Sequence, residues 1–265
     1  MTPVGFRLVT LNTWKCDGAY RQRMALMAPG LRALAPDAVA LQECFVADDG
    51  SADTAGLLCA ATGLRSQAVR ARHKRRAFEG REVASWSCQT VLHAHPVLRS
   101  EALLLPSPPG DDDRLAQLVR LDVQGFAVTL ANVHLTHLPE ADAPGWRARQ
   151  LQAVRDALEG WGPCALTVVC GDFNADLNSA SLQGFMRGPD ALQDAFARVG
   201  QDRTPTFFDD LGQGRVLDHV LVVPALSQAR IDAVSADTVL RADRPDERGI
   251  APSDHSGLLM ALRLS

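Results

Sequence analysis

An apolar run that ends in polar residues constrains this chain more than any other feature. The run covers residues 165–169 (Ala-Leu-Thr-Val-Val), and Cys170 and Gly171 lead from it to Asp172 and Asn174. Its β-branched residues and the glycine after them predict a buried strand that ends at a cleft. Asp172 and Asn174 are two residues apart, so their side chains leave the same side of an extended chain. A carboxylate and an amide there suit a hard cation, an attacking water or a phosphate oxygen, although alone they would also suit a simple turn.

Length and composition place limits on the class of protein. The chain has 265 residues, 46% of them hydrophobic, and no apolar run reaches membrane-spanning length. No linker-like shift in composition divides it, so we expect a single catalytic domain over residues 1–265, and a monomer. Its first 14 residues lack the basic and apolar regions of a secretory signal, which predicts a cytoplasmic protein.

Cysteine spacing argues against zinc and disulfide sites, and the net charge argues against general attraction to nucleic acid. The six cysteines are scattered without a Cys-x-x-Cys pair, which argues against a zinc site and against a disulfide framework. The formal net charge of −4 provides no global field that favours nucleic acid. A polyanionic partner would therefore have to bind a local basic patch or bind through a metal ion.

Hydrophobic periodicity predicts an alternation of strands and helices. Helices are expected over 21–34, 51–62, 143–158 and 179–186, with Pro29 and Gly30 kinking or interrupting the first. Proline and acidic residues predict a loop over 106–113. Besides 165–169, strands are expected over 6–12, 38–43, 87–92, 98–105, 116–123, 126–134, 216–223 and 258–264.

Polar residues mark the ends of several of these strands. They are Asn12, Glu43, His134, Asp172 with Asn174, and Asp254 with His255, while Asp218 lies within an otherwise apolar strand. A carboxylate among apolar residues needs a partner, because an unpaired buried charge is costly. A set of carboxylates, amides and imidazoles fits magnesium or manganese better than zinc. Four other histidines, His93, His95, His137 and His219, are interpreted as structural or peripheral.

The dense basic run covers Arg70–Arg76 and continues to Arg81. Such a run is most simply interpreted as a solvated loop. The functional alternative is a contact to a phosphate backbone or an acidic headgroup, with Arg72 and Arg75 as candidate substrate-binding residues.

The polar motifs, taken in order, resemble those of the endonuclease/exonuclease/phosphatase superfamily from residue 6 to the C-terminus. They are Leu11-Asn12-Thr13-Trp14, Leu41-Gln42-Glu43, Asn132-Val133-His134, Gly171-Asp172-Phe173-Asn174, Leu217-Asp218-His219 and Ser253-Asp254-His255. Two departures concern arginines. Val216 stands where the family often has Arg in Arg-Ile-Asp-Tyr, and the segment 90–96 lacks the arginine of Ala-Ile-Leu-Ser-Arg-x-Pro.

The resemblance implies a DNase I-like fold, a four-layer α/β sandwich of two mixed sheets packed face to face with helices outside. It also implies hydrolysis of a phosphoester with Mg²⁺ or Mn²⁺. Glu43 would hold the ion with Asn12, and Asp254 would add charge beside it. Asp172 and Asn174 would orient or deprotonate the attacking water.

Further roles follow from the same resemblance. Asp218 would fix the ring of His255, whose other nitrogen would meet a phosphate oxygen or the water. His134 would contact the phosphate or donate a proton toward the leaving group. Arg147, with Gln150, resembles an Arg-x-x-Gln of some members and would support the site.

The expected activity is that of a metal-dependent phosphodiesterase, with nucleic acid or a small phosphodiester as substrate. One alternative is a phosphatase or phospholipase-type hydrolase of an inositol phosphate or a sphingomyelin-like lipid. It ranks second because only 5% of residues are aromatic, with no obvious exposed aromatic hairpin for membrane entry. A non-catalytic binding module on the same fold is the other alternative, although no central motif residue is missing.

Overall fold

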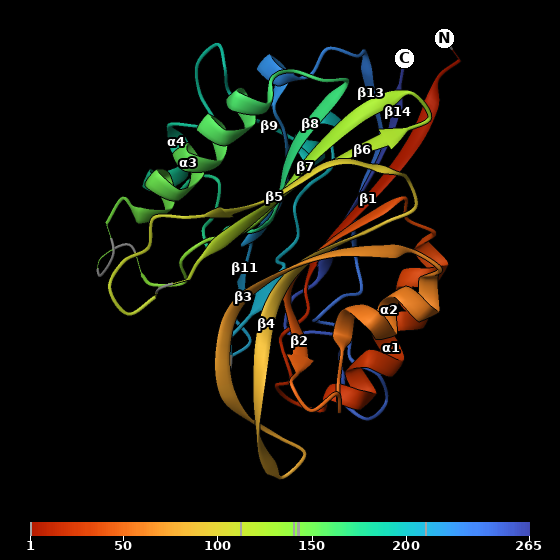
Figure 1. The fold of residues 1–265 in the computed structure, drawn as a ribbon. Coiled ribbons are helices and arrows are strands. Elements are labelled where there is room, and N and C mark those ends of the chain that lie inside the picture. Colours follow the sequence, from red (N-terminus) through yellow and green to blue (C-terminus); the bar gives the residue numbers. More distant parts are fainter. Residues whose placement is uncertain (1, 112, 140, 142–143, 210) are drawn as a thin grey trace.

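The computed structural model describes residues 2–111, 113–139, 141, 144–209 and 211–265 (Figure 1). Two large sheets dominate the described part of the chain. The first has the order β13 (Ile231–Val239), β14 (Gly257–Leu264), β1 (Val4–Asn12), β2 (Ala38–Ala47), β4 (Arg81–His93) and β3 (Arg65–Phe78). The second has the order β5 (Val97–Leu104), β6 (Leu115–Val123), β7 (Phe126–His134), β8 (Leu166–Asp172), β12 (Asp218–Val222) and β9 (Gln193–Asp194).

Helices cover the outer face of each sheet (Figure 1). On the first sheet these are α1 (Tyr20–Leu34) and α2 (Thr54–Thr62), and on the second they are α3 (Trp146–Trp161) and the short α4 (Ala180–Gln183). Smaller elements complete the fold: α5 (Ala195–Arg198), the 3-10 helix η1 (Pro224–Leu226), and a hairpin of β10 (Phe207–Phe208) and β11 (Gly214–Arg215). The four-layer α/β sandwich is therefore confirmed.

Strand alternation explains how the layers form. In β1, Phe6 and Leu8 pack into the core between the sheets, whereas Val9 and Leu11 pack against the layer with α1 and α2. In β8, Leu166 and Val168 face the central core. Because side chains alternate, the next even-numbered positions place Asn12 and Asp172 on the same inner faces, at the strand ends.

Parallel pairing then brings strand ends together. β1 pairs in parallel with β2, and β7 pairs in parallel with β8, while the neighbouring pairs are antiparallel, so both sheets are mixed. In this register Asn12 lies beside Gln42, and His134 lies beside Asp172. Gln42 Nε2 also donates to Asn132 Oδ1 at 2.7 Å, a bond that joins the two sheets just below the polar strand ends.

Several boundaries differ from the prediction. The first helix continues through Pro29 to Leu34 without interruption. The helix expected over 179–186 is only four residues long, and β13 was not predicted. The helix expected to begin at residue 143, which lies outside the described residues, begins at Trp146.

The interpretation of the basic run as a loop is wrong, because Arg70–Arg76 belong to the 14-residue strand β3. This strand pairs with β4 along its whole length, so backbone hydrogen bonds hold residues whose side chains show no apolar alternation. No helix among the described residues is long and apolar enough to cross a membrane.

Candidate active site

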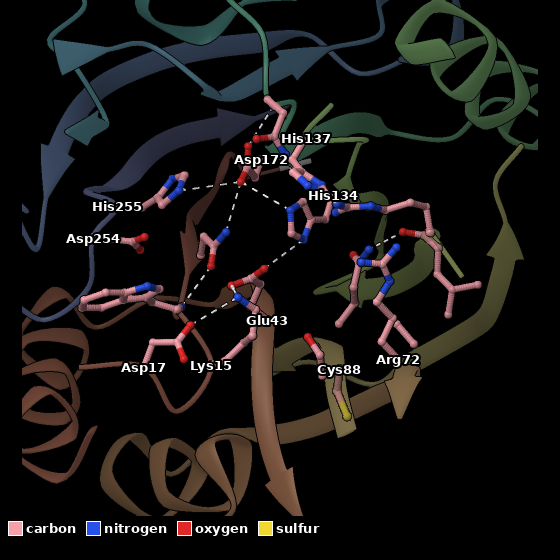
Figure 2. Close-up of a pocket in the computed structure, with 18 of the residues that line it drawn as sticks. Lys15, Asp17, Glu43, Arg72, Cys88, His134, His137, Asp172, Asp254 and His255 are labelled. Carbon is pink, nitrogen blue, oxygen red and sulfur yellow. Dashed lines mark hydrogen bonds and ion pairs between the residues drawn. The ribbon is translucent and has the colours of Figure 1, made fainter. Parts of the chain in front are cut away.

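A cleft of about 690 Å³ opens at the polar ends of the inner strands (Figure 2). It brings together most of the residues singled out in the sequence. Those that line it are Asn12, Glu43, Arg72, His134, Asp172, Asn174, Asp254 and His255. Asp218 lies behind this lining, in contact with His255.

Three nitrogens face a single oxygen, Asp172 Oδ2, as the dashed lines of Figure 2 show. Asn12 Nδ2 donates to it at 3.1 Å, and His134 Nε2 and His255 Nε2 lie 3.6 and 3.8 Å away. The other oxygen of Asp172 accepts the backbone N–H of Asn174 at 2.8 Å. Burial raises the pKa of Asp172, with the charge of Asp218 adding to the effect. Asp172 is thus the centre of the cluster and a carboxylate prepared to take a proton.

Asp218 and His255 form a buried pair. His255 Nδ1 lies 2.8 Å from Asp218 Oδ2, and Asp218 is the register partner of Asp172 on the neighbouring strand. Burial acts to lower the pKa of His255, but the carboxylates of Asp218 and Asp172 outweigh it and raise the pKa. A hydrogen bond to Nδ1 fixes the ring and leaves Nε2 directed toward Asp172.

His134 differs from His255 in its environment. Its Nδ1 lies 4.0 Å from Glu43 Oε1, and its Nε2 faces Asp172. Burial lowers the pKa of His134 well below the usual value, and the charges of Arg114 and Lys15 lower it further. The pKa values of His134 and His255 are therefore shifted in opposite directions, which favours a neutral ring for His134 and an imidazolium for His255.

Glu43 reaches the cleft through an irregularity in β2. The register between β2 and β4 shifts between Leu41 and Cys44, and Glu43 has a positive φ of 59°. Two residues of β2, Gln42 and Glu43, thus oppose one residue of β4, which is a β-bulge. Plain alternation would turn Glu43 away from Gln42 and out of the cleft, so the bulge is what aims it inward.

Gly171 allows the close approach that places Asp172. Its φ is +135°, and a Cβ atom there would lie 2.1 Å from the carbonyl oxygen of Val133. Only glycine fits this position beside β7. After Asp172 the chain turns through Asn174, whose φ is 51° and whose Nδ2 donates to the Leu135 carbonyl at 3.0 Å.

The oxygen donors of the cleft fit a hard divalent cation. Glu43, Asp172 and Asp254 supply carboxylates beside the amide of Asn12. Burial raises the pKa of Asp254, and the charge of Glu43 acts in the same direction, whereas the charge of His255 opposes it. A second group of possible ligand atoms comes from Asp172, Asp218 and His255, and these atoms lie within 4.8 Å of one another. Because His255 is already bonded to Asp218 and hard cations prefer oxygen, the set around Glu43 fits Mg²⁺ better.

Two basic residues of this region were not predicted. Lys15 Nζ lies 3.0 Å from Glu43 Oε2; burial acts to lower the pKa of Lys15, but the charge of Glu43 outweighs it and raises the pKa. Arg23 on α1 is buried and donates to five backbone carbonyls around the cleft-lining segment. They belong to Thr13, Trp14, Lys15, Asp17 and Pro252. The sequence signal for Arg23 was its position on the apolar face of the predicted helix, beside Met24 and Met27, where a charged side chain needs buried partners.

The remaining predicted residues separate into three places. Arg72 lines the cleft, but Arg75 points to the opposite face of β3, where its Nε donates to Glu82 at 2.9 Å. Arg147 is buried outside the lining and donates to the carbonyls of Thr136 and Leu138, which suits a supporting role.

Of the other histidines, His93 and His219 are buried, and His95 is bonded to Asp37. His137 is different, because it lines the cleft beside Arg114.

Comparisons with known proteins agree with the fold. An endonuclease/exonuclease/phosphatase family protein from Bacteroides thetaiotaomicron has a TM-score of 0.74 at 16% identity, with 100% of both chains covered. A D. rerio TDP2 humanized by 14 mutations has a TM-score of 0.70 at 17% identity, covering 97% of this chain and 98% of the other. The human Nocturnin catalytic domain with bound sulfate anion has a TM-score of 0.67 at 19% identity, covering 98% of this chain and 95% of the other.

At these identities the solved structures show the fold alone. No protein with a curated description gives a significant match. The sequence profile of the Endonuclease/Exonuclease/phosphatase family, however, matches residues 9–255. The chain therefore belongs to this family of phosphoester hydrolases, which generally depend on a divalent metal ion.

Proposed function

We propose that this protein is a phosphodiesterase that uses Mg²⁺ or Mn²⁺ to cleave nucleic acid or a small phosphodiester. The observation that carries the proposal is the convergence of Asn12, His134 and His255 on Asp172, beside the carboxylate of Glu43. In support, the cleft of about 690 Å³ has the volume of a typical small-molecule site and carries basic residues on its wall.

The roles follow from the contacts. Asp172 orients the attacking water and takes its proton, since burial raises its pKa toward that of a useful base. Asp218 holds His255, whose Nε2 faces the phosphoryl group and offsets its charge. Neutral His134 donates a hydrogen bond toward a phosphoryl oxygen or the leaving group. A divalent cation held by Glu43, Asn12 and Asp254 would supply further charge neutralisation there.

Hydrolysis of bis(p-nitrophenyl) phosphate tests the proposal directly. We expect turnover with Mg²⁺ or Mn²⁺ and none after exhaustive chelation. Glu43→Gln keeps the shape of the side chain and removes its charge, so it should weaken Mn²⁺ binding in calorimetric titration and lower turnover. Glu82→Gln is the control, because Glu82 is exposed on β4 and pairs with Arg75. Full activity after chelation, or wild-type metal affinity in Glu43→Gln, would contradict the assignment.

A lipid substrate remains the second candidate because of the hairpin β10–β11. Leu211 in its turn is 82% exposed, and Phe207 on β10 lies 5.0 Å from the His255 ring. The exposed Leu211 side chain on this hairpin would give the protein one apolar contact with a membrane surface. Faster hydrolysis of sphingomyelin in vesicles, or of an inositol phosphate, than of every soluble diester would favour that alternative. A monomeric cytoplasmic enzyme stays our prediction, tested by size-exclusion chromatography and cell fractionation.

A further inference from the structure

One wall of the cleft is basic and lies apart from the carboxylates around Asp172. Figure 2 places Arg72 on the opposite side of the cleft from Asp254 and His255. We call this region the basic wall, and it consists of Arg72, Lys74 and Arg76 from β3 together with Arg114 and His137. Because side chains alternate, Arg72, Lys74 and Arg76 share the inner face of β3, whereas Arg75 points away.

A buried carboxylate organises two of these arginines. Asp111 is fully buried, and its Oδ1 accepts from Arg72 Nη2 at 2.6 Å and from Arg114 Nη2 at 2.9 Å. Its Oδ2 accepts from Arg114 Nε at 2.9 Å and from Thr136 Oγ1 at 2.6 Å. Burial acts to raise the pKa of Asp111, but Arg114 and the other donors outweigh it and lower the pKa to about 2. Asp111 is therefore ionised and holds two guanidinium groups side by side.

The basic wall has more positive than negative charge. Among the described residues it contains four basic side chains, those of Arg72, Lys74, Arg76 and Arg114, while Asp111 pairs with Arg72 and Arg114 and Asp113 also lines the cleft. The Lys74 ammonium is exposed and makes no ion pair with any residue that the structure describes. Guanidinium groups match the oxygens of a phosphate, and an anion bound here would also relieve their mutual repulsion.

We propose that the basic wall binds a second phosphate group of the substrate, so that the enzyme selects a phosphodiester carrying a further phosphate beside the scissile one. This inference rests on the proposed phosphodiesterase function. The chemistry is shared by a bisphosphorylated nucleotide and by an oligonucleotide, which presents one phosphate per residue. The competing explanation is that the basic wall only holds β3 against the loop before β6. Substitutions in the wall would then lower the stability of the protein without changing its substrate preference.

Two substrates separate these outcomes: thymidine 5′-(p-nitrophenyl phosphate) and the same compound with a 3′-phosphate. The measured quantity is the ratio of their kcat/KM values. We expect wild type to prefer the 3′-phosphorylated compound by about tenfold in kcat/KM, because a single charge-assisted hydrogen bond to the extra phosphate contributes about that much binding free energy. The ratio should fall toward one in Arg72→Gln and by a few-fold in Lys74→Gln. Lys74→Gln breaks no hydrogen bond of the described structure, so it tests the site even if Arg72→Gln fails to fold.

Arg75→Gln is the matched control, since Arg75 lies on the same strand but faces away from the cleft. It should keep the wild-type ratio. A wild-type ratio near one, or an unchanged ratio in both Arg72→Gln and Lys74→Gln, would overturn the proposal. An octathymidylate assayed alongside identifies the source of the second phosphate, because a polymer substrate should bind more tightly than the bisphosphorylated compound. In either case the preference must disappear in Arg72→Gln.

A binding measurement keeps this inference separate from the proposed function. If wild type hydrolyses neither compound, the phosphodiesterase proposal fails, and calorimetric titration in EDTA still tests the basic wall. Thymidine 3′,5′-bisphosphate should then bind wild type and Arg75→Gln more tightly than thymidine 5′-monophosphate does. Equal affinities for the two nucleotides in wild type would overturn the inference by itself.

Discussion

Replacing Arg23 by Met should strongly destabilise the protein, because this side chain holds the segment that follows β1. Arg23 is 1% exposed and donates to the carbonyls of Thr13 at 2.9 Å, Lys15 and Asp17 at 3.0 Å, Trp14 at 3.1 Å and Pro252 at 3.2 Å. Trp14 and Lys15 both have positive φ, so the backbone they form is strained and depends on outside bonds.

The magnitude follows from these bonds. Hydrogen bonds to a charged group contribute about 1.5–3 kcal/mol each, but several of the carbonyls are only partly buried and would gain water in the variant. Removing one partner of a buried charged network typically costs about 3–5 kcal/mol. We therefore expect Arg23→Met to lose about 3 kcal/mol, which lowers the Tm by roughly 6–12 °C at about 2–4 °C per kcal/mol.

Urea denaturation followed by circular dichroism, together with scanning calorimetry, measures this loss. Arg32→Met is the matched control, since Arg32 lies exposed in the last turn of the same helix, and it should change stability by less than about 0.5 kcal/mol. An Arg23→Met variant within about 1 kcal/mol of wild type would refute the reasoning.

Two further predictions concern residues that position the site. His219 Nε2 lies 2.7 Å from the Ala175 carbonyl and Nδ1 lies 2.8 Å from Arg203, and burial lowers the pKa of His219 to about 3. Its neutral form stabilises the fold fully above pH about 6.5, and this contribution is lost at up to about 1.4 kcal/mol per unit as pH falls toward 3. The stability gap between wild type and His219→Gln should thus shrink from pH 7 to pH 4 in urea titrations, and parallel curves would contradict the assignment. Gly171→Ala should cost more than about 2 kcal/mol in the same assay, because its Cβ would meet the Val133 carbonyl, whereas Gly160→Ala, with no atom within 4 Å, should be nearly neutral.

Strand pattern and polar ends could be predicted from the sequence. The apolar runs over 6–12 and 165–169 predicted strands that end at Asn12 and Asp172, and the structure has these ends on the inner faces, with His134 beside Asp172 through the parallel pairing of β7 and β8. Glu43 was also identified, although the β-bulge that turns it inward leaves no local signal. Its position depends on how β2 pairs with β4, which is a non-local property.

Long-range polar contacts were not predictable. Asp111 lay in a loop that was interpreted only as proline-rich and acidic, yet it joins Arg72 of β3 to Arg114 within the basic wall. The basic run lacked apolar alternation, so the sequence could not show that it forms an edge strand with its positive charges divided between two faces. Hydrogen-bond partners of this kind are set by tertiary packing rather than by local preference.

The central claim is that Asp218 acts through His255, and a double-mutant cycle on kcat tests it most directly. With bis(p-nitrophenyl) phosphate and saturating Mg²⁺, His255→Ala should lower kcat by orders of magnitude and Asp218→Asn by somewhat less, with native circular dichroism in both. Because Asp218 Oδ2 lies 2.8 Å from His255 Nδ1 and fixes the ring, the double variant should be no slower than His255→Ala alone. Losses that multiply in the double variant would contradict the claim that the two residues work as a unit.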